Sequence, residues 1–231
     1  GADQPLPHPE VNISIGFPFV NYGDKWDFND QNLDLGTNWD LPGYNFSHAG
    51  WTRENDAGND GGLYGFENSA LPAPGIQTPL LNSSDEDNHI TYYFRRALDI
   101  DLSTMPDTVE FGLRRDDGAL VYLNGVEIIR DNLPAGAITS TTLAPITVTG
   151  SDETAYFTTL VPKTAFRNGV NQLAVEVHNR DVFSSDLGFD MYIKDAPIIN
   201  PPALGCSNGN QAHIACFTSI APTSQTTNML I

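Results

Sequence analysis

The chain has 231 residues, 40% of them hydrophobic and 10% aromatic, which is enough to bury a sizeable core in one large domain. Acidic residues number 29 and basic residues 11, so the formal net charge is −18. This charge repels nucleic-acid phosphates and anionic lipids, and no apolar run has transmembrane length, so we expect neither nucleic-acid binding nor membrane insertion.

Residues 1–20 contain a one-sided strand. In the stretch VNISIGFPFV, apolar residues alternate strictly with small or polar ones, which is typical of a β-strand with one buried face. Pro18 lacks a backbone N–H, so this strand is expected at a sheet edge or near its own end. The apolar face consists of Val11, Ile13, Ile15, Phe17 and Phe19. We predict an arm that covers this face either on its own domain or by adding to the sheet of a neighbouring copy.

The region after the arm is rich in turn residues and holds all three tryptophans. Aromatic faces beside polar groups bind sugars, and large aromatic residues also fill β-sandwich cores, so both interpretations stand. His178 ends a later strand, where a hydrogen-bonded structural histidine is the simpler interpretation. The carbohydrate-binding candidates are Trp39, Trp51, Arg53 and His178.

One loop partly resembles a calcium-binding sequence. In DAGNDGGLYGFE (56–67), Asp56, Asp60 and Glu67 occupy positions one, five and twelve of an EF-hand pattern. Position three is Gly58 instead of Asp or Asn, and no helical pattern flanks the loop. We therefore expect no EF-hand and no required cofactor. Two interpretations remain, an irregular Ca²⁺ loop with these three ligands and a glycine-rich loop without metal.

The rest of the chain is a series of strand-like runs separated by Gly, Pro, Asn and Asp, with no convincing amphipathic helix. The expected strands are residues 89–101, 108–115, 119–123, 126–130, 154–161, 170–179 and 187–193. Many short strands with this punctuation predict an all-β fold, namely an antiparallel β-sandwich of the jelly-roll type.

The charged stretch RRDDGALVYLNGVEIIRDN (114–132) resembles a catalytic cluster at first sight. Asn124-Gly125 between two β-rich runs predicts a type I′ hairpin, because both turn positions need positive φ. Residues 116–118, Asp-Asp-Gly, predict a second tight turn with solvated charges. Arg114 and Arg115 are consecutive in a strand, so they point to opposite faces and cannot clamp one ligand together. The stretch is therefore interpreted as two turns.

The C-terminal region begins with a proline-rich connector, DAPIINPPALG (195–205). Cys206 and Cys216 are the only cysteines, too few for a four-ligand metal site, so a local disulfide is expected. The chain also contains three N-glycosylation sequons, at Asn12, Asn45 and Asn82. Disulfide and sequons together favour a secreted, extracellular protein.

Five segments carry a resemblance to a known module. They are KWDFND with LGTNWDLPGYN (25–45), GGLYGFENSALPAPGIQTPL (61–80), TYYFRRALDID (91–101), RRDDGALVYLNGVEIIRDNLPAG (114–136) and NQLAVEVHNRDVFSSDLGFDMYI (171–193). This order resembles the galactose-binding-like jelly-roll modules of secreted bacterial proteins, which are similar to carbohydrate-binding modules. The resemblance implies a sandwich that is not itself catalytic and that often serves carbohydrate binding or assembly. It divides the chain into an arm (1–20), a sandwich (21–195) and a connector with a tail (196–231).

Three functions are compatible with these features. The preferred hypothesis is a non-catalytic extracellular structural subunit that self-assembles into a filament, because head-to-tail strand addition does not close. The alternative is a carbohydrate-binding accessory module of a secreted hydrolase, with glycans as partners. The third is an unrecognised hydrolase. No Gly-x-Ser-x-Gly motif and no metalloprotease spacing of histidines occurs, but a pair of carboxylates that meets only in space leaves no local motif.

Overall fold

The computed structural model describes residues 19–46, 50–67, 75–82 and 89–197. Strands dominate these residues, and the helical elements are two short 3₁₀ turns, η1 (Gly150–Glu153) and η2 (Lys163–Ala165). Neither of these turns, nor any other described part of the chain, forms an apolar helix long enough to span a bilayer.

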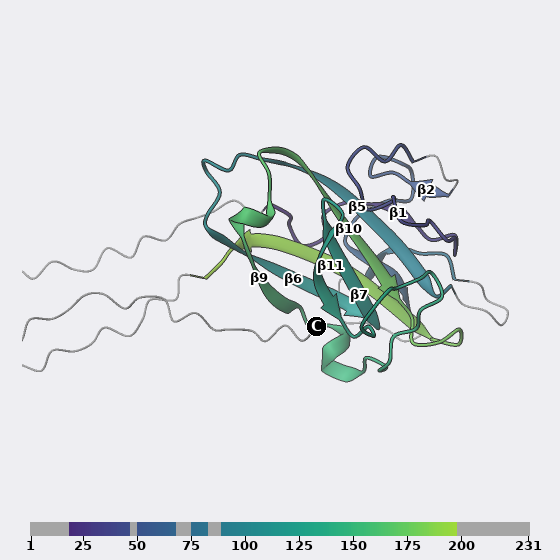
Figure 1. Cartoon of the computed structure of the whole chain (residues 1–231). Coiled ribbons are helices and arrows are strands. Elements are labelled where there is room, and N and C mark those ends of the chain that lie inside the picture. The colour runs from purple at the N-terminus through teal and green to yellow at the C-terminus, as the bar shows by residue number, and fades with distance from the viewer. Residues whose placement is uncertain (1–18, 47–49, 68–74, 83–88, 198–231) are drawn as a thin grey trace, which may run out of the picture. The chain divides into compact units, whose positions relative to one another are not determined.

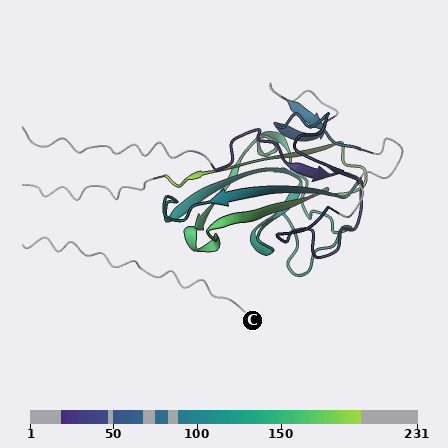
Figure 2. The same ribbon diagram turned by 90° about the horizontal axis from the view of Figure 1, so that it is seen from above.

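The strands form two sheets (Figure 1). The six-stranded sheet has the order β2 (Trp51–Thr52), β1 (Asp27–Asn29), β5 (Thr91–Ile100), β10 (Gly169–His178), β7 (Gly118–Leu123) and β8 (Val126–Asp131). The five-stranded sheet has the order β4 (Ile76–Pro79), β3 (Leu63–Glu67), β11 (Asp186–Asp195), β6 (Thr108–Asp116) and β9 (Phe157–Pro162). All pairs are antiparallel except β3 with β4. The view from above shows the long strands running in the same general direction (Figure 2), and the predicted β-sandwich is confirmed.

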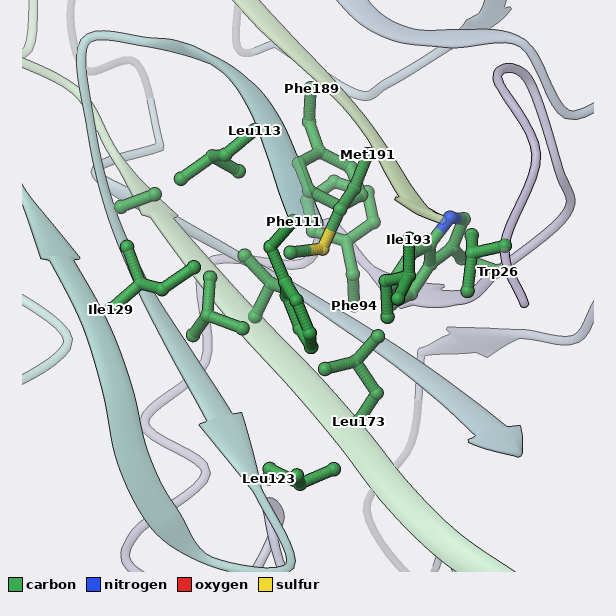
Figure 3. Close-up of a cluster of buried hydrophobic side chains, with 14 of the residues drawn as sticks. Trp26, Phe94, Phe111, Leu113, Leu123, Ile129, Leu173, Phe189, Met191 and Ile193 are labelled. Carbon is green, nitrogen blue, oxygen red and sulfur yellow. The ribbon is translucent and has the colours of Figure 1, made fainter. Parts of the chain in front are cut away.

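The core lies between the two sheets, because alternate residues of each strand face inward. Phe94 of β5 stacks on Phe189 of β11, with 4.1 Å between ring centroids and 29° between ring planes. Trp26 packs its edge against Phe189 at 5.3 Å and is completely buried. Figure 3 shows these side chains together with Phe111 and Met191. Trp26 is therefore a core residue.

The predicted hairpin is confirmed. β7 and β8 pair on either side of Asn124-Gly125, and both turn residues have positive φ, 54° and 81°. The strand bounds match the predicted ranges to within about three residues, because turn residues mark the ends of these segments.

The second predicted turn has a different environment. β6 and β7 belong to different sheets, so residues 116–118 form a corner between the layers. Asp117 is 1% exposed, its Oδ1 accepts the Val148 N–H at 2.8 Å, and its Oδ2 accepts the Arg180 N–H at 2.7 Å. A Cβ at Gly118 would lie 2.4 Å from the Asn132 carbonyl oxygen, so only glycine fits there. The prediction of solvated turn charges was wrong, because this corner is packed into the fold.

The two arginines before this corner diverge as predicted. Arg114 donates from Nε to the Glu153 carbonyl oxygen at 2.8 Å. Arg115 is paired through Nε with Asp131 Oδ2 at 2.9 Å, and its guanidinium lies 4.5 Å from the centre of the Phe157 ring. The two side chains therefore have different partners in the fold.

The end of the predicted arm lies in the sandwich. Val20 forms an antiparallel bridge with Ile193 of β11, and the Val20 side chain is fully buried. Phe19 donates its N–H to the Ile193 carbonyl oxygen at 2.8 Å and packs against the core. The remaining residues of the predicted apolar face lie outside the described residues: Val11, Ile13, Ile15 and Phe17.

Candidate functional site

The outer face of the six-stranded sheet carries a second set of aromatic and acidic residues. Tyr93 of β5 and Tyr122 of β7 alternate with core residues, so their side chains point away from the sandwich interior. Glu176 of β10 lies directly opposite Tyr93 in the strand register, and Tyr122 lies opposite Ala174. Three neighbouring strands therefore present these side chains at one place.

The loop that contains Leu35 and Trp39 packs on this outer face. Both residues are nearly buried and form a small hydrophobic cluster with Tyr93 and Ala174. Trp39 meets the Tyr93 ring edge-to-face at 4.8 Å and the Tyr122 ring at 5.8 Å. Such pairs contribute about 0.5–1.5 kcal/mol each beyond the area they bury. The loop is thus fixed on the sheet by aromatic contacts.

A pocket of about 370 Å³ lies where this loop meets the sheet. Its size is within the range of small-ligand sites, roughly 300–1,000 Å³. Its walls combine aromatic faces, hydroxyl groups and carboxyl groups. The lining residues are Asp34, Gly36, Thr37, Trp39, Asp40, Tyr93, Tyr122, Ile138, Thr139, Ser140 and Glu176.

Glu176 is held in place by Tyr122. The Tyr122 hydroxyl donates to Glu176 Oε1 at 2.6 Å. Burial and, secondly, the charge of Glu176 raise the pKa of Tyr122. The tyrosine therefore remains a protonated donor at neutral pH, and Glu176 presents a fixed carboxylate to the pocket.

His178 supports the site from behind. It is completely buried, and its Nδ1 lies 2.8 Å from the Thr142 carbonyl oxygen and 3.0 Å from Thr91 Oγ1. A carbonyl oxygen can only accept, so Nδ1 carries the proton. His178 is not a lining residue of the pocket, and its hydrogen bonds are those of a structural histidine.

Asp40 has an unused acceptor. The residue is 9% exposed, and its buried Oδ1 receives no hydrogen bond from any residue that the structure describes. Burial raises the pKa of Asp40; a backbone hydrogen bond opposes this shift and the charge of Glu176 adds to it. A buried acceptor without a donor costs about 1–3 kcal/mol. Asp40 lines the pocket, so a ligand hydroxyl or amine that reached this oxygen would offset that cost.

The charge of the lining selects the ligand class. Three lining residues are acidic, Asp34, Asp40 and Glu176, and none of the lining residues is basic. Ionised carboxylates accept hydrogen bonds and cannot donate them. The pocket therefore favours a ligand rich in hydrogen-bond donors and disfavours an anion.

The other two candidates, Trp51 and Arg53, lie outside the pocket lining, and Trp51 packs against the cluster that contains Trp39. Trp51 Nε1–H donates to the Tyr44 hydroxyl at 3.2 Å and is half-buried. Arg53 lies 3.5 Å above the centre of the Phe46 ring and pairs with Asp27 at 2.9 Å. Of the four predicted residues, only Trp39 lines the pocket.

The predicted calcium loop is not assembled as a site. Asp56 Oδ2 accepts the Arg53 N–H at 2.8 Å, which is ordinary turn chemistry. Glu67 lies instead with Glu153 and Asp186, and this is the one group of metal-compatible side chains found among the described residues. Asp56 and Asp60 do not belong to this group, so the structure does not bring the three predicted ligands together.

Several sequence predictions lie wholly or partly outside the described residues. Asn12, Cys206 and Cys216 belong to this group, so glycosylation at Asn12 and the disulfide stay predictions. Asn45 and Asn82 are described, and both are exposed.

No protein-family model matches the chain, and no curated protein matches it. The chain resembles a beta-glycosidase from Bacteroides vulgatus (16% identity, TM-score 0.38, 75% of this chain and 20% of that chain). It also resembles a glycosyl hydrolase family 2 member from Bacteroides cellulosilyticus (13%, 0.41, 75% and 20%) and the β-glucuronidase from Ruminococcus gnavus (11%, 0.41, 80% and 29%). The chain thus spans only a fifth to about three tenths of these glycosidases, and the predicted galactose-binding-like family stays a prediction.

Proposed function

We propose that this chain is a non-catalytic, extracellular carbohydrate-binding domain whose ligand is a neutral sugar or short oligosaccharide. The ligand occupies the pocket on the outer face of the six-stranded sheet. The observation that carries the proposal is the pocket lining, which combines the rings of Trp39, Tyr93 and Tyr122 with three carboxyl groups and no basic residue.

Sugars match both halves of this lining. Their C–H faces pack on aromatic rings, here those of Trp39, Tyr93 and Tyr122. Their hydroxyl groups donate to Asp40 and Glu176 and exchange hydrogen bonds with the hydroxyl side chains of the lining. The absence of basic lining residues argues for a neutral sugar over a uronic acid.

A binding role also fits the hydrogen bond that Glu176 accepts from Tyr122. Its Oε1 accepts a short hydrogen bond from Tyr122, which fixes the carboxylate as an acceptor. Glycoside hydrolysis needs two carboxyl groups that act on opposite sides of the scissile bond. Release of reducing sugar from a bound oligosaccharide, abolished by Asp40→Asn, would contradict the non-catalytic role.

Binding is tested with a glycan array, followed by calorimetry on the best ligand. Asp40→Ala removes a charge-assisted acceptor worth about 1.5–3 kcal/mol, so we expect Kd to rise by about 10- to 150-fold. Trp51→Phe is the control: Trp51 packs against the Trp39 cluster but does not line the pocket, so Kd is expected to stay unchanged. Loss of binding in Trp51→Phe with normal binding in Asp40→Ala would move the site to the surface around Trp51, and selective binding of choline-like amines would replace the ligand class.

Self-assembly by the arm stays a prediction from the sequence, carried by the alternation of residues 11–20. Charged residues in place of Ile13 and Ile15 are expected to abolish oligomers in light scattering while circular dichroism still reports a folded β-protein. A monodisperse monomer of the unaltered chain at high concentration would contradict this prediction and leaves the sugar-binding proposal intact.

A further inference from the structure

Four carboxyl groups gather at one end of the outer face of the five-stranded sheet. Glu67 ends β3 and lies directly opposite Asp186, which begins β11. Asp116 ends β6 opposite Gly188, two residues from Asp186, and therefore lies on the same face. Glu153 is contributed by η1, whose residues contact β6. This acidic cluster belongs to the other sheet from the sugar pocket.

The spacing of three of these groups suits a calcium ion. One carboxylate oxygen each from Glu67, Glu153 and Asp186 can be chosen so that all three lie within 4.8 Å of one another. Ligand oxygens lie about 2.3–2.6 Å from Ca²⁺, so two ligands of one ion are at most about 4.6–5.2 Å apart. All three side chains are half-buried, which leaves the group reachable by an ion while most of it is shielded from water.

Asp116 gives an independent indication that a cation is needed there. The residue is 4% exposed, and its buried Oδ1 has no hydrogen-bond partner among the described residues. Asp116 lies opposite Gly188 in the strand register, so its side chain is on the sheet face that also carries Asp186 and Glu67.

The neighbouring charged groups do not neutralise Asp116. Both oxygens of Asp117 already accept backbone N–H groups. Arg114 is directed to the Glu153 carbonyl oxygen and Arg115 to Asp131. A buried, unpaired carboxylate is costly, and a bound divalent cation is a standard way to offset that cost.

We propose that Glu67, Glu153 and Asp186 bind one Ca²⁺ ion, with Asp116 facing it from β6. Ca²⁺ suits these ligands better than Mg²⁺, because they come from separate elements, and Ca²⁺ tolerates irregular geometry while Mg²⁺ demands a near-ideal octahedron. The ion links the ends of β3, β6 and β11 with η1, so it stabilises the fold without taking part in sugar binding.

The test uses the full chain, freed of metal with a chelator and titrated with CaCl₂ in calorimetry and thermal unfolding. We expect saturable binding and a rise in Tm of about 5–10 °C at a Ca²⁺ concentration one hundred times Kd. MgCl₂ and NaCl of equal ionic strength are expected to give a much smaller rise. Equal rises with all three salts would mean charge screening and would overturn the proposal.

Two variants and one control locate the ion. Asp186→Asn and Glu153→Gln are expected to lose the Ca²⁺-dependent rise in Tm, and Glu153→Gln decides the matter if Asp186→Asn does not fold. Asp56→Asn, in the loop that resembles an EF-hand, is expected to respond like the unaltered chain. A full response in Glu153→Gln, or a loss of response in Asp56→Asn, would overturn the assignment. Sugar binding by Glu153→Gln is expected to be unchanged, so this proposal and the sugar-binding proposal fail separately.

Discussion

Phe189→Ala is expected to lower the free energy of unfolding by about 3–5 kcal/mol, the usual cost of truncating a buried phenylalanine. Phe189 is fully buried. The centre of its ring lies 4.1 Å from that of Phe94 and 5.3 Å from that of Trp26. The side chain therefore joins the two sheets, and its removal leaves a cavity that strands on both sides cannot easily close.

Urea unfolding followed by circular dichroism measures this change. Leu160→Ala is a matched control, because Leu160 lies on β9 of the same sheet and is 52% exposed. We expect the control to change stability by less than about 0.5 kcal/mol. If Phe189→Ala lowered the free energy of unfolding by less than about 1 kcal/mol, the two sheets would not pack through this residue.

Asp117→Ala is expected to destabilise the chain by about 3 kcal/mol or more, since two backbone N–H groups lose a charged acceptor worth about 1.5–3 kcal/mol each. Those donors belong to Val148 and Arg180, which lie in two different loops. One buried carboxylate thus fastens both loops to the corner between β6 and β7.

Thermal unfolding and hydrogen exchange report on this corner. The Val148 and Arg180 amides are expected to exchange faster in Asp117→Ala than in the unaltered chain. Asp117→Asn keeps one acceptor oxygen, so its exchange rates are expected to lie between those of the unaltered chain and of Asp117→Ala. Asp101→Asn is the control, because Asp101 accepts hydrogen bonds from Ser103 in an exposed turn. If both amides were as well protected from exchange in Asp117→Ala as in the unaltered chain, the anchoring role would be contradicted.

The sequence predicted the strands well because each is a β-rich run bounded by Gly, Pro, Asn or Asp. The seven predicted runs correspond to β5 through β11, and the Asn124-Gly125 turn has the backbone conformation that its residues favour. The sequence could not show that β6 and β7 belong to different sheets. A tight corner within a hairpin and one between layers have similar local sequences, so the burial of Asp117 was not predictable.

The candidate site was mostly missed, because strands distant in sequence meet there. Tyr93, Tyr122 and Glu176 stand on three strands that become neighbours only in the folded sheet. Trp39 was identified from its residue type alone. The outward positions of those strands held the useful signal, because a tyrosine or glutamate that alternates with core residues lies on the outer face. The acidic cluster was missed for the same reason, since its ligands come from β3, β11 and η1.

The three tryptophans allow the sugar-binding claim to be tested in one measurement. Their indole N–H groups are expected to give separate NMR signals, because Trp39 lines the pocket, Trp26 lies in the core, and Trp51 lies outside the lining with its N–H donated to the Tyr44 hydroxyl. During titration with the array-selected oligosaccharide, we predict a saturable shift of the Trp39 indole signal, while the Trp26 and Trp51 signals stay in place. A shift confined to Trp51, or saturable binding that leaves Trp39 unmoved, would contradict the sheet-face pocket as the sugar site.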